Sequence, residues 1–158
     1  MDEQAKKTAL RMIPYGLFVV STREGDTVNA FAANWLTQAS FAPPLVAMAA
    51  KAGQAGTNML ESSGVFCVNV LESGQTQLAT KFFSPMERVG NKFGDVEFKL
   101  SANGCPILND ALAFFECRVV DKVTRGDHTV FIGEVIEAGV QREGEPLTLA
   151  ETGFKYGG

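Results

Sequence analysis

The chain has 158 residues, a formal net charge of −4, 46% hydrophobic residues and 20% charged residues. This length and composition predict one globular domain with one core over residues 1–158. The negative balance argues against a nucleic-acid-binding face, which needs clustered basic residues.

No basic segment precedes an apolar run at the N-terminus, so no signal peptide is expected. The longest weakly polar stretch, 41–50, is too short to span a bilayer and holds two prolines, so we expect no membrane contact. Cys67, Cys105 and Cys117 are far apart and odd in number, and with one histidine they give no zinc-binding spacing. Buried, reduced thiols are therefore expected, and the cytoplasm is the simplest location.

In chain order, apolar periodicity predicts six or seven short strands and three small helices. Ala5, Ala9 and Met12 fall on one face of the first helix, and Pro14 ends it. Pro43-Pro44 cannot lie inside a central strand, so the third strand begins at Leu45. The predicted elements are a helix over 3–13, strands over 17–22, 27–33 and 45–50, a helix over 55–62, a strand over 65–71, a helix capped by Ser73, strands over 112–124 and 129–138, and an edge strand over 146–149.

Two segments carry weaker signals. Residues 84–105 lack clear periodicity and are expected to be loop-like, either covering a ligand or making a plain surface excursion. Residues 154–158 give no prediction. Because no βαβ series is visible, a mainly β fold fits better than a doubly wound sheet: a closed or nearly closed antiparallel barrel with a few short peripheral helices.

Residues 29–44 hold the strongest candidate for a binding site. Ala30, Ala32 and Ala33 would let a flat molecule approach the backbone, and Trp35 offers a large apolar plate. Donors and acceptors follow at Asn34, Thr37, Gln38 and Ser40. This pattern indicates the wall of a site for a flat, phosphorylated ligand; the alternative is a buried strand and a polar loop, with Trp35 in the core.

An anion site is outlined just downstream. Thr57 opens the predicted helix after Gly53 and Gly56, and backbone N–H groups at a helix start can hold a phosphate together with a hydroxyl. Lys51, at the end of the third strand, could neutralise part of the phosphate charge. The alternative is plain helix capping by Thr57, with Lys51 in solvent.

Side chains for the common hydrolytic reactions are missing. The sequence has no G-x-G-x-x-G, no Walker A loop, no G-x-S-x-G and no evident carboxylate pair, so any reactivity has to come from a cofactor. His128 follows a Gly-Asp turn and begins a strand. Its ring could reach over a cofactor from the rim of the barrel, or it could be an ordinary turn histidine.

Several segments occur in a recognisable order. They are GLFVVST at 16–22, NAFAANWLTQASFAPPLVAMAA at 29–50, SSGVFCVNVL at 62–71, LATKFF at 78–83 and GDHTVFIGEV at 126–135. The Ser-x-x-Pro-Pro pattern, the Val-Asn-Val-Leu strand and the Gly-Asp-His hairpin together form a specific signature. From Tyr15 to Ile136 the chain resembles the flavin reductase-like family of FMN-binding split β-barrels.

The resemblance implies a homodimer with FMN, or FAD in some members, held near the subunit interface. By the resemblance, the flavin ring would be contacted by Ala33, Asn34, Trp35, Leu36 and Thr37, and the ribityl chain and phosphate by Ser40, Lys51, Gln54, Thr57 and Asn58. The aromatic residues that help to close the site would be Phe82 and Phe83, and the residue beside the flavin or nicotinamide would be His128.

The implied activity is hydride transfer from NADH or NADPH to flavin, with reduced flavin supplied to a partner monooxygenase. A second hypothesis is an FMN-bound electron carrier of the flavoredoxin kind, which exchanges electrons with redox protein partners without NAD(P)H turnover. A third is a module that stores or senses flavin or a ligand of tetrapyrrole size.

Overall fold

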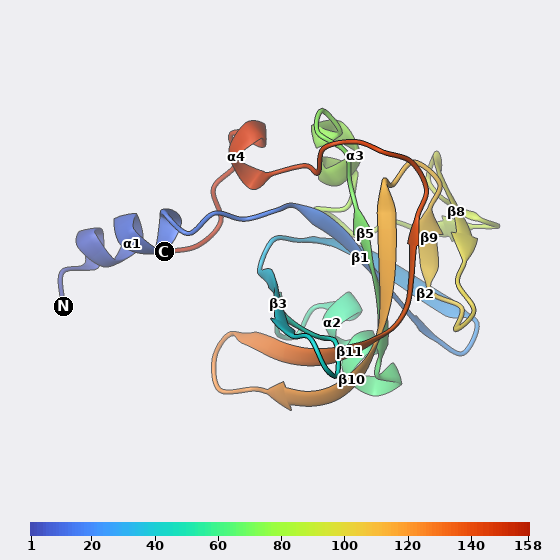
Figure 1. Cartoon of the computed structure of the whole chain (residues 1–158), viewed down its shortest axis with the longest axis horizontal. Helices are drawn as coiled ribbons and strands as arrows, with labels where there is room; N and C mark the ends of the chain where they lie inside the picture. Colours follow the sequence, from blue (N-terminus) through green and yellow to red (C-terminus); the bar gives the residue numbers. More distant parts are fainter.

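Eleven strands and four helices make up the protein (Figure 1). The computed structural model describes residues 1–158. The elements are α1 (Glu3–Arg11), β1 (Phe18–Glu24), β2 (Thr27–Ala33), β3 (Leu36–Ser40), β4 (Leu45–Lys51), α2 (Ala55–Ser63), β5 (Val65–Val70), α3 (Thr76–Lys81), β6 (Arg88–Val89), β7 (Lys92–Phe93), β8 (Val96–Leu100), β9 (Pro106–Leu108), β10 (Ala113–Val123), β11 (His128–Val140) and α4 (Leu149–Thr152). The prediction of a mainly β fold with short helices is confirmed.

The main sheet has seven strands in the order β2-β1-β5-β10-β11-β4-β3, and every neighbouring pair is antiparallel. Register shifts interrupt the long β10–β11 hairpin at Glu116/Cys117 and at Val119/Asp121. Such irregularities bend and twist a strand pair, and the sheet curls strongly (Figure 1). Helix α2 packs against β1 and β2, while a smaller sheet, β6-β7-β8-β9, contacts β1, β2 and β5 through β9.

Strand β1 separates the two main hydrophobic clusters because successive side chains on a strand point to opposite faces. Val19 belongs to the cluster that includes Phe82 and Phe93, beneath the smaller sheet and α3. Val20 belongs to the cluster with Phe66 and others from the curled main sheet. The chain therefore buries apolar surface on both faces of its central strands.

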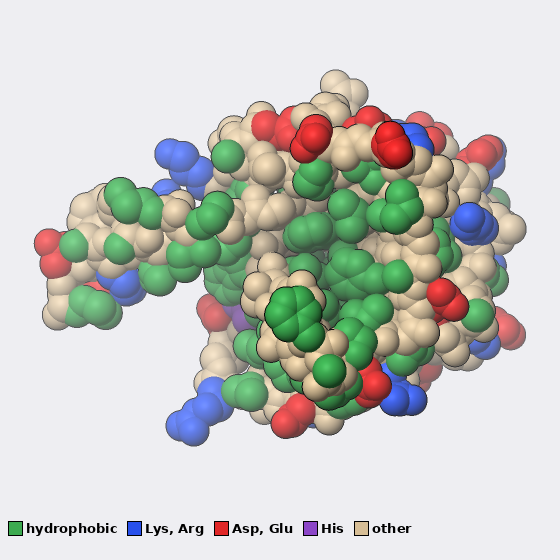
Figure 2. Space-filling view, viewed as in Figure 1, with side chains coloured by type: hydrophobic (Ala, Val, Ile, Leu, Met, Phe, Trp, Pro, Cys, Tyr) green, Lys and Arg blue, Asp and Glu red, His purple; other side chains and the backbone are tan.

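Helix α1 forms where the sequence predicted a helix, but its apolar face is not buried. None of its residues is buried, although Asp2 caps the helix by accepting a hydrogen bond from the backbone N–H of Ala5 at 3.0 Å. The helix projects from the body, and hydrophobic side chains are visible along it (Figure 2). Leu10, Met12 and Ile13 are 42%, 75% and 48% exposed. None of the four helices has the length and apolar character needed to cross a membrane.

Five strands, β3 and β6 to β9, lie where the sequence predicted none. Strand β3 is an edge strand whose middle residues are exposed, so it lacks the apolar alternation that reveals a strand. Strands β6, β7 and β8 occupy part of the segment predicted as a loop. The first two have only two residues each, too few to show a period, but β8 buries Val96 and Phe98 in alternation.

The last two helices also differ from the prediction. Gln75, and not Ser73, is the N-cap of α3; the Ser73 hydroxyl instead donates to Glu151 at 3.0 Å. The predicted edge strand over 146–149 reduces to isolated bridges at Pro146 and Thr148. Thr148 and Glu151 form a capping box that starts α4 there.

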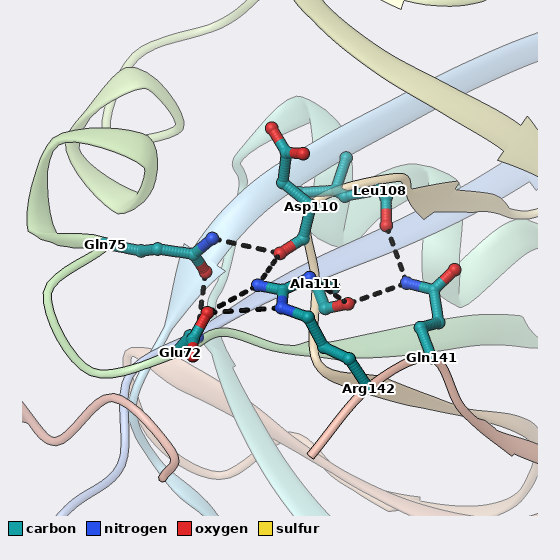
Figure 3. Close-up of polar contacts among 7 residues, drawn as sticks. All are labelled: Glu72, Gln75, Leu108, Asp110, Ala111, Gln141 and Arg142. Atoms are coloured by element: carbon teal, nitrogen blue, oxygen red, sulfur yellow. Dashed lines mark hydrogen bonds and ion pairs between the residues drawn. The ribbon is translucent and has the colours of Figure 1, made fainter. Parts of the chain in front are cut away.

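A polar network fixes the segment that follows β11 to two other loops (Figure 3). The Arg142 guanidinium donates to the Glu72 carboxylate at 2.7 Å and to the carbonyls of Asp110 and Ala111. The Gln141 amide donates to the carbonyls of Ala111 and Leu108 at 2.8 and 3.0 Å. This network ties the loops after β5 and β9 to the loop after β11.

Candidate functional site

A cavity of about 550 Å³ opens between α2, the end of β2 and the start of β11. Its volume lies within the usual range for small-molecule sites, roughly 300–1,000 Å³. Its lining residues come from distant parts of the chain. They are Leu17, Asn29, Ala30, Phe31, Ala32, Ala33, Asn34, Ala49, Ala50, Lys51, Gln54, Ala55, Gly56, Thr57, Phe82, Phe83, Ser84, Pro85, His128, Leu149, Phe154, Lys155 and Tyr156.

Small side chains form one wall of the cavity. Ala32 and Ala33 come from β2, and Ala49 and Ala50 come from β4. The backbone N–H of Ala32 donates to the carbonyl of Phe82 at 3.1 Å, which holds the end of α3 against β2. A flat ligand could therefore approach the backbone along this wall, as the alanine pattern predicted.

The N-terminus of α2 forms a second wall. Gln54 is the N-cap and makes no side-chain capping bond, and the first N–H groups of a helix have no partner within it. Lys51, at the end of β4, lines the same wall. A Cβ at Gly56 would lie 2.5 Å from the Phe31 ring, so this close approach of helix and strand requires glycine. Backbone donors and a lysine make this end of the cavity suited to an anion.

The Thr57 hydroxyl was predicted to bind a phosphate or to cap the helix, and the structure gives it a different hydrogen bond. Thr57 is the third residue of α2 and not its cap, and its buried hydroxyl donates to the Lys51 carbonyl at 2.8 Å. The hydroxyl hydrogen is thus already used. Thr57 ties the start of the helix to the end of β4, which leaves the backbone N–H groups and Lys51 as the donors.

Asn34 marks the polar edge of the cavity. The residue is 8% exposed, and its Nδ2 is fully buried with no hydrogen-bond partner. Buried donors without partners are uncommon because each costs about 1–3 kcal/mol. The Nε1 of the neighbouring Trp35 is also buried and unpaired. An acceptor-bearing ligand in the cavity would satisfy Asn34, which fits the carbonyl oxygens of a flavin ring.

His128 stands on the rim with both ring nitrogens engaged. Nδ1 lies 2.8 Å from Oδ1 of Asp127, and Nε2 lies 2.7 Å from the hydroxyl of Tyr156. The Trp35 ring packs beside the imidazole, with centroids 4.4 Å apart. The hydrogen bond to His128 lowers the pKa of Asp127, while burial and the nearby Asp127 charge raise the pKa of Tyr156.

The cavity brings together eight of the residues predicted for the site: Ala33, Asn34, Lys51, Gln54, Thr57, Phe82, Phe83 and His128. Five others lie outside it in the single chain: Trp35, Leu36, Thr37, Ser40 and Asn58. Thr37 and Asn58 are exposed, Leu36 packs on the barrel core, and Trp35 lies behind His128.

The C-terminal residues Phe154, Lys155 and Tyr156 also line the cavity, although no pattern in the sequence predicted a role for them. Their ring partners, Phe83 and His128, are far away in the sequence, so local periodicity carries no signal. The one local feature that could have indicated a role is the pair of aromatic residues, Phe154 and Tyr156, between Gly153 and Gly157.

A curled antiparallel sheet with a cavity suited to a small molecule is typical of ligand-binding β-barrels. The sequence comparison narrows this class. The chain belongs to the flavin reductase like domain family, whose profile matches residues 10–158.

Relatives and solved structures agree with this assignment. A flavin reductase of Pseudomonas putida is 32% identical over 159 residues, which covers 100% of this chain and 91% of the relative. Diflavin flavoprotein A 1 of Synechocystis sp. is 32% identical over 143 residues, covering 90% of this chain but 25% of that protein. The chain therefore spans about a quarter of the length of this larger relative.

Two solved structures share nearly the whole fold. BorF, the flavin reductase component of a bacterial two-component tryptophan halogenase, superposes with a TM-score of 0.82 at 26% identity, covering 99% of this chain and 98% of that one. Flavin reductase HpaC complexed with NADP+ gives a TM-score of 0.78 at 27% identity, covering 99% and 97%.

Proposed function

We propose that the protein is an NAD(P)H:flavin oxidoreductase that binds FMN, with FAD as the alternative flavin. One observation carries the proposal: a single cavity joins an anion-binding end, at Lys51 and the start of α2, to the unpaired buried donor of Asn34. These two ends match the phosphate and the carbonyl-bearing ring of a flavin mononucleotide. The name of the full-length Pseudomonas putida relative supports the same activity.

The residues act by binding and orientation. Lys51 and the α2 backbone would hold the phosphate, while Ala33 and Asn34 would lie along the ring edge. When bound, the flavin supplies the redox chemistry by accepting a hydride from NADH or NADPH. Phe82 and Phe83 close one side of the cavity and keep water from the reacting face, and His128 bounds the side where a nicotinamide would lie. No side chain is assigned covalent catalysis.

The cofactor residues outside the single-chain cavity are part of the same proposal. Trp35 and Leu36 would support the ring wall from behind, and Thr37, Ser40 and Asn58 would meet the ribityl phosphate when a second subunit or the ligand extends the site. Asn58 lies in the first turn of α2, one residue beyond Thr57.

Anaerobic reduction tests the activity. The FMN-loaded protein is mixed with NADH and, separately, with NADPH, and the flavin absorption band is followed. Rapid stoichiometric bleaching, followed by turnover when free flavin is added, supports a flavin reductase. Bleaching by neither nucleotide contradicts it and favours the electron carrier that exchanges electrons with proteins.

Supply of reduced flavin to a partner oxygenase is the proposed physiological role. BorF is a component of a two-component halogenase, which supports a division of labour between a reductase and a partner enzyme. The alternative is a redox protein that takes electrons from bound flavin. Catalytic release of reduced free flavin favours the first, and electron transfer without flavin release favours the second.

We further propose a homodimer with flavin near its interface. The apolar side chains of Phe41 and Phe83 are 90% and 51% exposed, and Phe83 lines the cavity, so a second copy would bury apolar surface and extend the site. Sedimentation of a monomer at micromolar concentration, with flavin bound, would contradict the dimer. The three buried free thiols favour a reducing compartment, and we propose the cytoplasm.

A further inference from the structure

The C-terminal strap, residues 153–158, closes one side of the cavity. It leaves α4 at Gly153, whose φ of +76° is left-handed and suits glycine. Phe154 then meets the Phe83 ring edge to face, with centroids 5.3 Å apart, and Tyr156 reaches His128 on the opposite rim. The strap therefore crosses from the α3 side of the cavity to the β11 side.

The far end of the strap is held by α1. The Arg11 Nε donates to the Gly157 carbonyl at 3.0 Å, and Gly158 lies close to the backbone of Lys7. Gly157 also lies near the Trp35 ring. Contacts on both sides of Tyr156 thus hold its hydroxyl beside the imidazole.

The hydrogen bonds of His128 define the tautomer of its neutral ring. Asp127 is a carboxylate at neutral pH and can only accept, so Nδ1 must carry a hydrogen. Nε2 then has a lone pair and accepts the Tyr156 O–H at 2.7 Å. If the ring becomes protonated, Nε2–H donates to the Tyr156 oxygen, so both nitrogens keep their partners in either charge state.

From this geometry we propose that Tyr156 is a positioning residue that acts through His128. The Asp127–His128–Tyr156 chain fixes the imidazole as an Nδ1–H tautomer and occupies both nitrogens. The ring therefore bounds the cavity as a rigid wall and has no free nitrogen to donate a proton to a ligand. The consequence for nicotinamide binding rests on the proposed reductase function, whereas the tautomer does not.

Trp35 completes the support of this wall. Its ring centroid is 4.4 Å from that of His128 and 5.2 Å from that of Tyr156, so the three rings pack together. A nicotinamide that lies against His128 would thus meet a surface fixed by two hydrogen bonds and one aromatic contact. Fixing a surface beside the reacting atoms raises the fraction of bound substrate in a reactive geometry.

The test compares Tyr156→Phe with Tyr15→Phe. The first change removes the hydroxyl and keeps the ring; the second removes the other tyrosine hydroxyl, which lies 3.4 Å from the Leu10 carbonyl outside the cavity. Because the chain has one histidine, ¹⁵N-histidine NMR of the flavin-free protein reports His128 alone. We expect the Nδ1–H tautomer in all three proteins, because Asp127 is unchanged, and a changed Nε2 signal in Tyr156→Phe alone, because Nε2 has lost its hydrogen-bond donor.

The second readout is the anaerobic rate of flavin reduction by nicotinamide. Tyr156→Phe should lower the maximal rate about fivefold, the scale of one lost hydrogen bond, with unchanged flavin affinity and melting temperature. An Nε2–H tautomer in the wild type, or a Tyr156→Phe variant that matches the wild type in NMR and rate, would overturn the proposal. If nicotinamide does not reduce the wild type, the reductase function fails, and NMR still decides the role of Tyr156.

Discussion

Two buried asparagines of the same barrel have opposite surroundings. Asn69, in β5, is fully buried and uses all of its side-chain hydrogen-bonding groups: Nδ2 donates to the carbonyls of Val19 and Pro106, and Oδ1 accepts from the N–H of Leu108. Asn34 follows β2 at the cavity, and its buried Nδ2 has no partner. The hydrogen bonds of the Asn69 amide are all formed within the chain, whereas the Asn34 Nδ2 still lacks an acceptor.

The difference distinguishes a buried polar side chain that holds the fold together from one that is available to a ligand. The amide of Asn69 joins β1, β5 and β9, and so it holds the smaller sheet against the larger one. The Arg142 network makes similar connections at the end of β11 (Figure 3). The Asn34 Nδ2 makes no hydrogen bond within the chain, which supports the proposal that a ligand in the cavity accepts from it.

The largest effect is expected for Asn69→Ala. The change leaves the Leu108 N–H and the Val19 carbonyl without their side-chain partner in a buried site, and we expect unfolding to become easier by about 3 kcal/mol. Urea denaturation of the flavin-free protein measures this loss. Flavin affinity of the folded protein should stay the same. A variant as stable as the wild type would show that the hydrogen bonds of Asn69 do not stabilise the fold.

Asn34→Ala is expected to weaken flavin binding and to leave stability unchanged, the reverse of Asn69→Ala. It removes a donor that has no partner, so the flavin-free protein should unfold at the same urea concentration as the wild type or a slightly higher one. Flavin affinity should fall about tenfold, because one hydrogen bond to the ring is lost in a buried site. Fluorescence titration measures the affinity, and Asn69→Ala is the matched control. Destabilisation of the flavin-free protein without a change in affinity would make Asn34 structural.

The same contrast explains what the sequence could and could not predict. Asn69 lies in an apolar strand, VFCVNVL, whose pattern predicts β5 but says nothing of the partners of its amide. Asn34 lies among small residues before Trp35, and that local pattern predicted a ligand wall, which lines the cavity. Features set by neighbouring residues, such as the start of α2 at Ala55, could thus be predicted.

Features that depend on distant residues were not accessible. Tyr156 meets His128 across 28 positions, and Arg11 meets the Gly157 carbonyl across 146. Strand β3 gains its pairing from β4 while exposing its middle residues, so tertiary pairing and not an apolar pattern defines it. The role of the Thr57 hydroxyl also differs from the prediction: the hydroxyl donates to the Lys51 carbonyl, a contact that the local pattern does not reveal.

Glu151 is a third polar side chain to compare: its carboxylate accepts several hydrogen bonds, but it is exposed to solvent. Its substitution is therefore expected to have the smallest effect on stability. Its carboxylate accepts from the Gly74 N–H at 3.0 Å, the Thr148 N–H at 3.2 Å and the Ser73 hydroxyl at 3.0 Å. The backbone hydrogen bond from Gly74, followed by the one from Thr148 and that from Ser73, lowers the pKa of Glu151 below its usual 4.5. A lowered pKa in the folded state means that this stabilisation is present above pH 4.5 and is lost as the pH falls through the folded-state value.

Glu151→Gln should therefore lower the melting temperature slightly at neutral pH and by less in acid, so that the wild-type and variant curves converge below pH 4.5. Glu143→Gln, at an exposed carboxylate, is the control and should follow the wild type at every pH. Glu151 caps α4, and the C-terminal strap follows this helix. If Glu151→Gln also displaces the strap, the hydrogen bond between Tyr156 and His128 is lost, and the histidine NMR signal changes. Curves that coincide at every pH would mean that pairing at this exposed site contributes nothing measurable, and curves that diverge in acid would mean that these bonds do not stabilise the carboxylate.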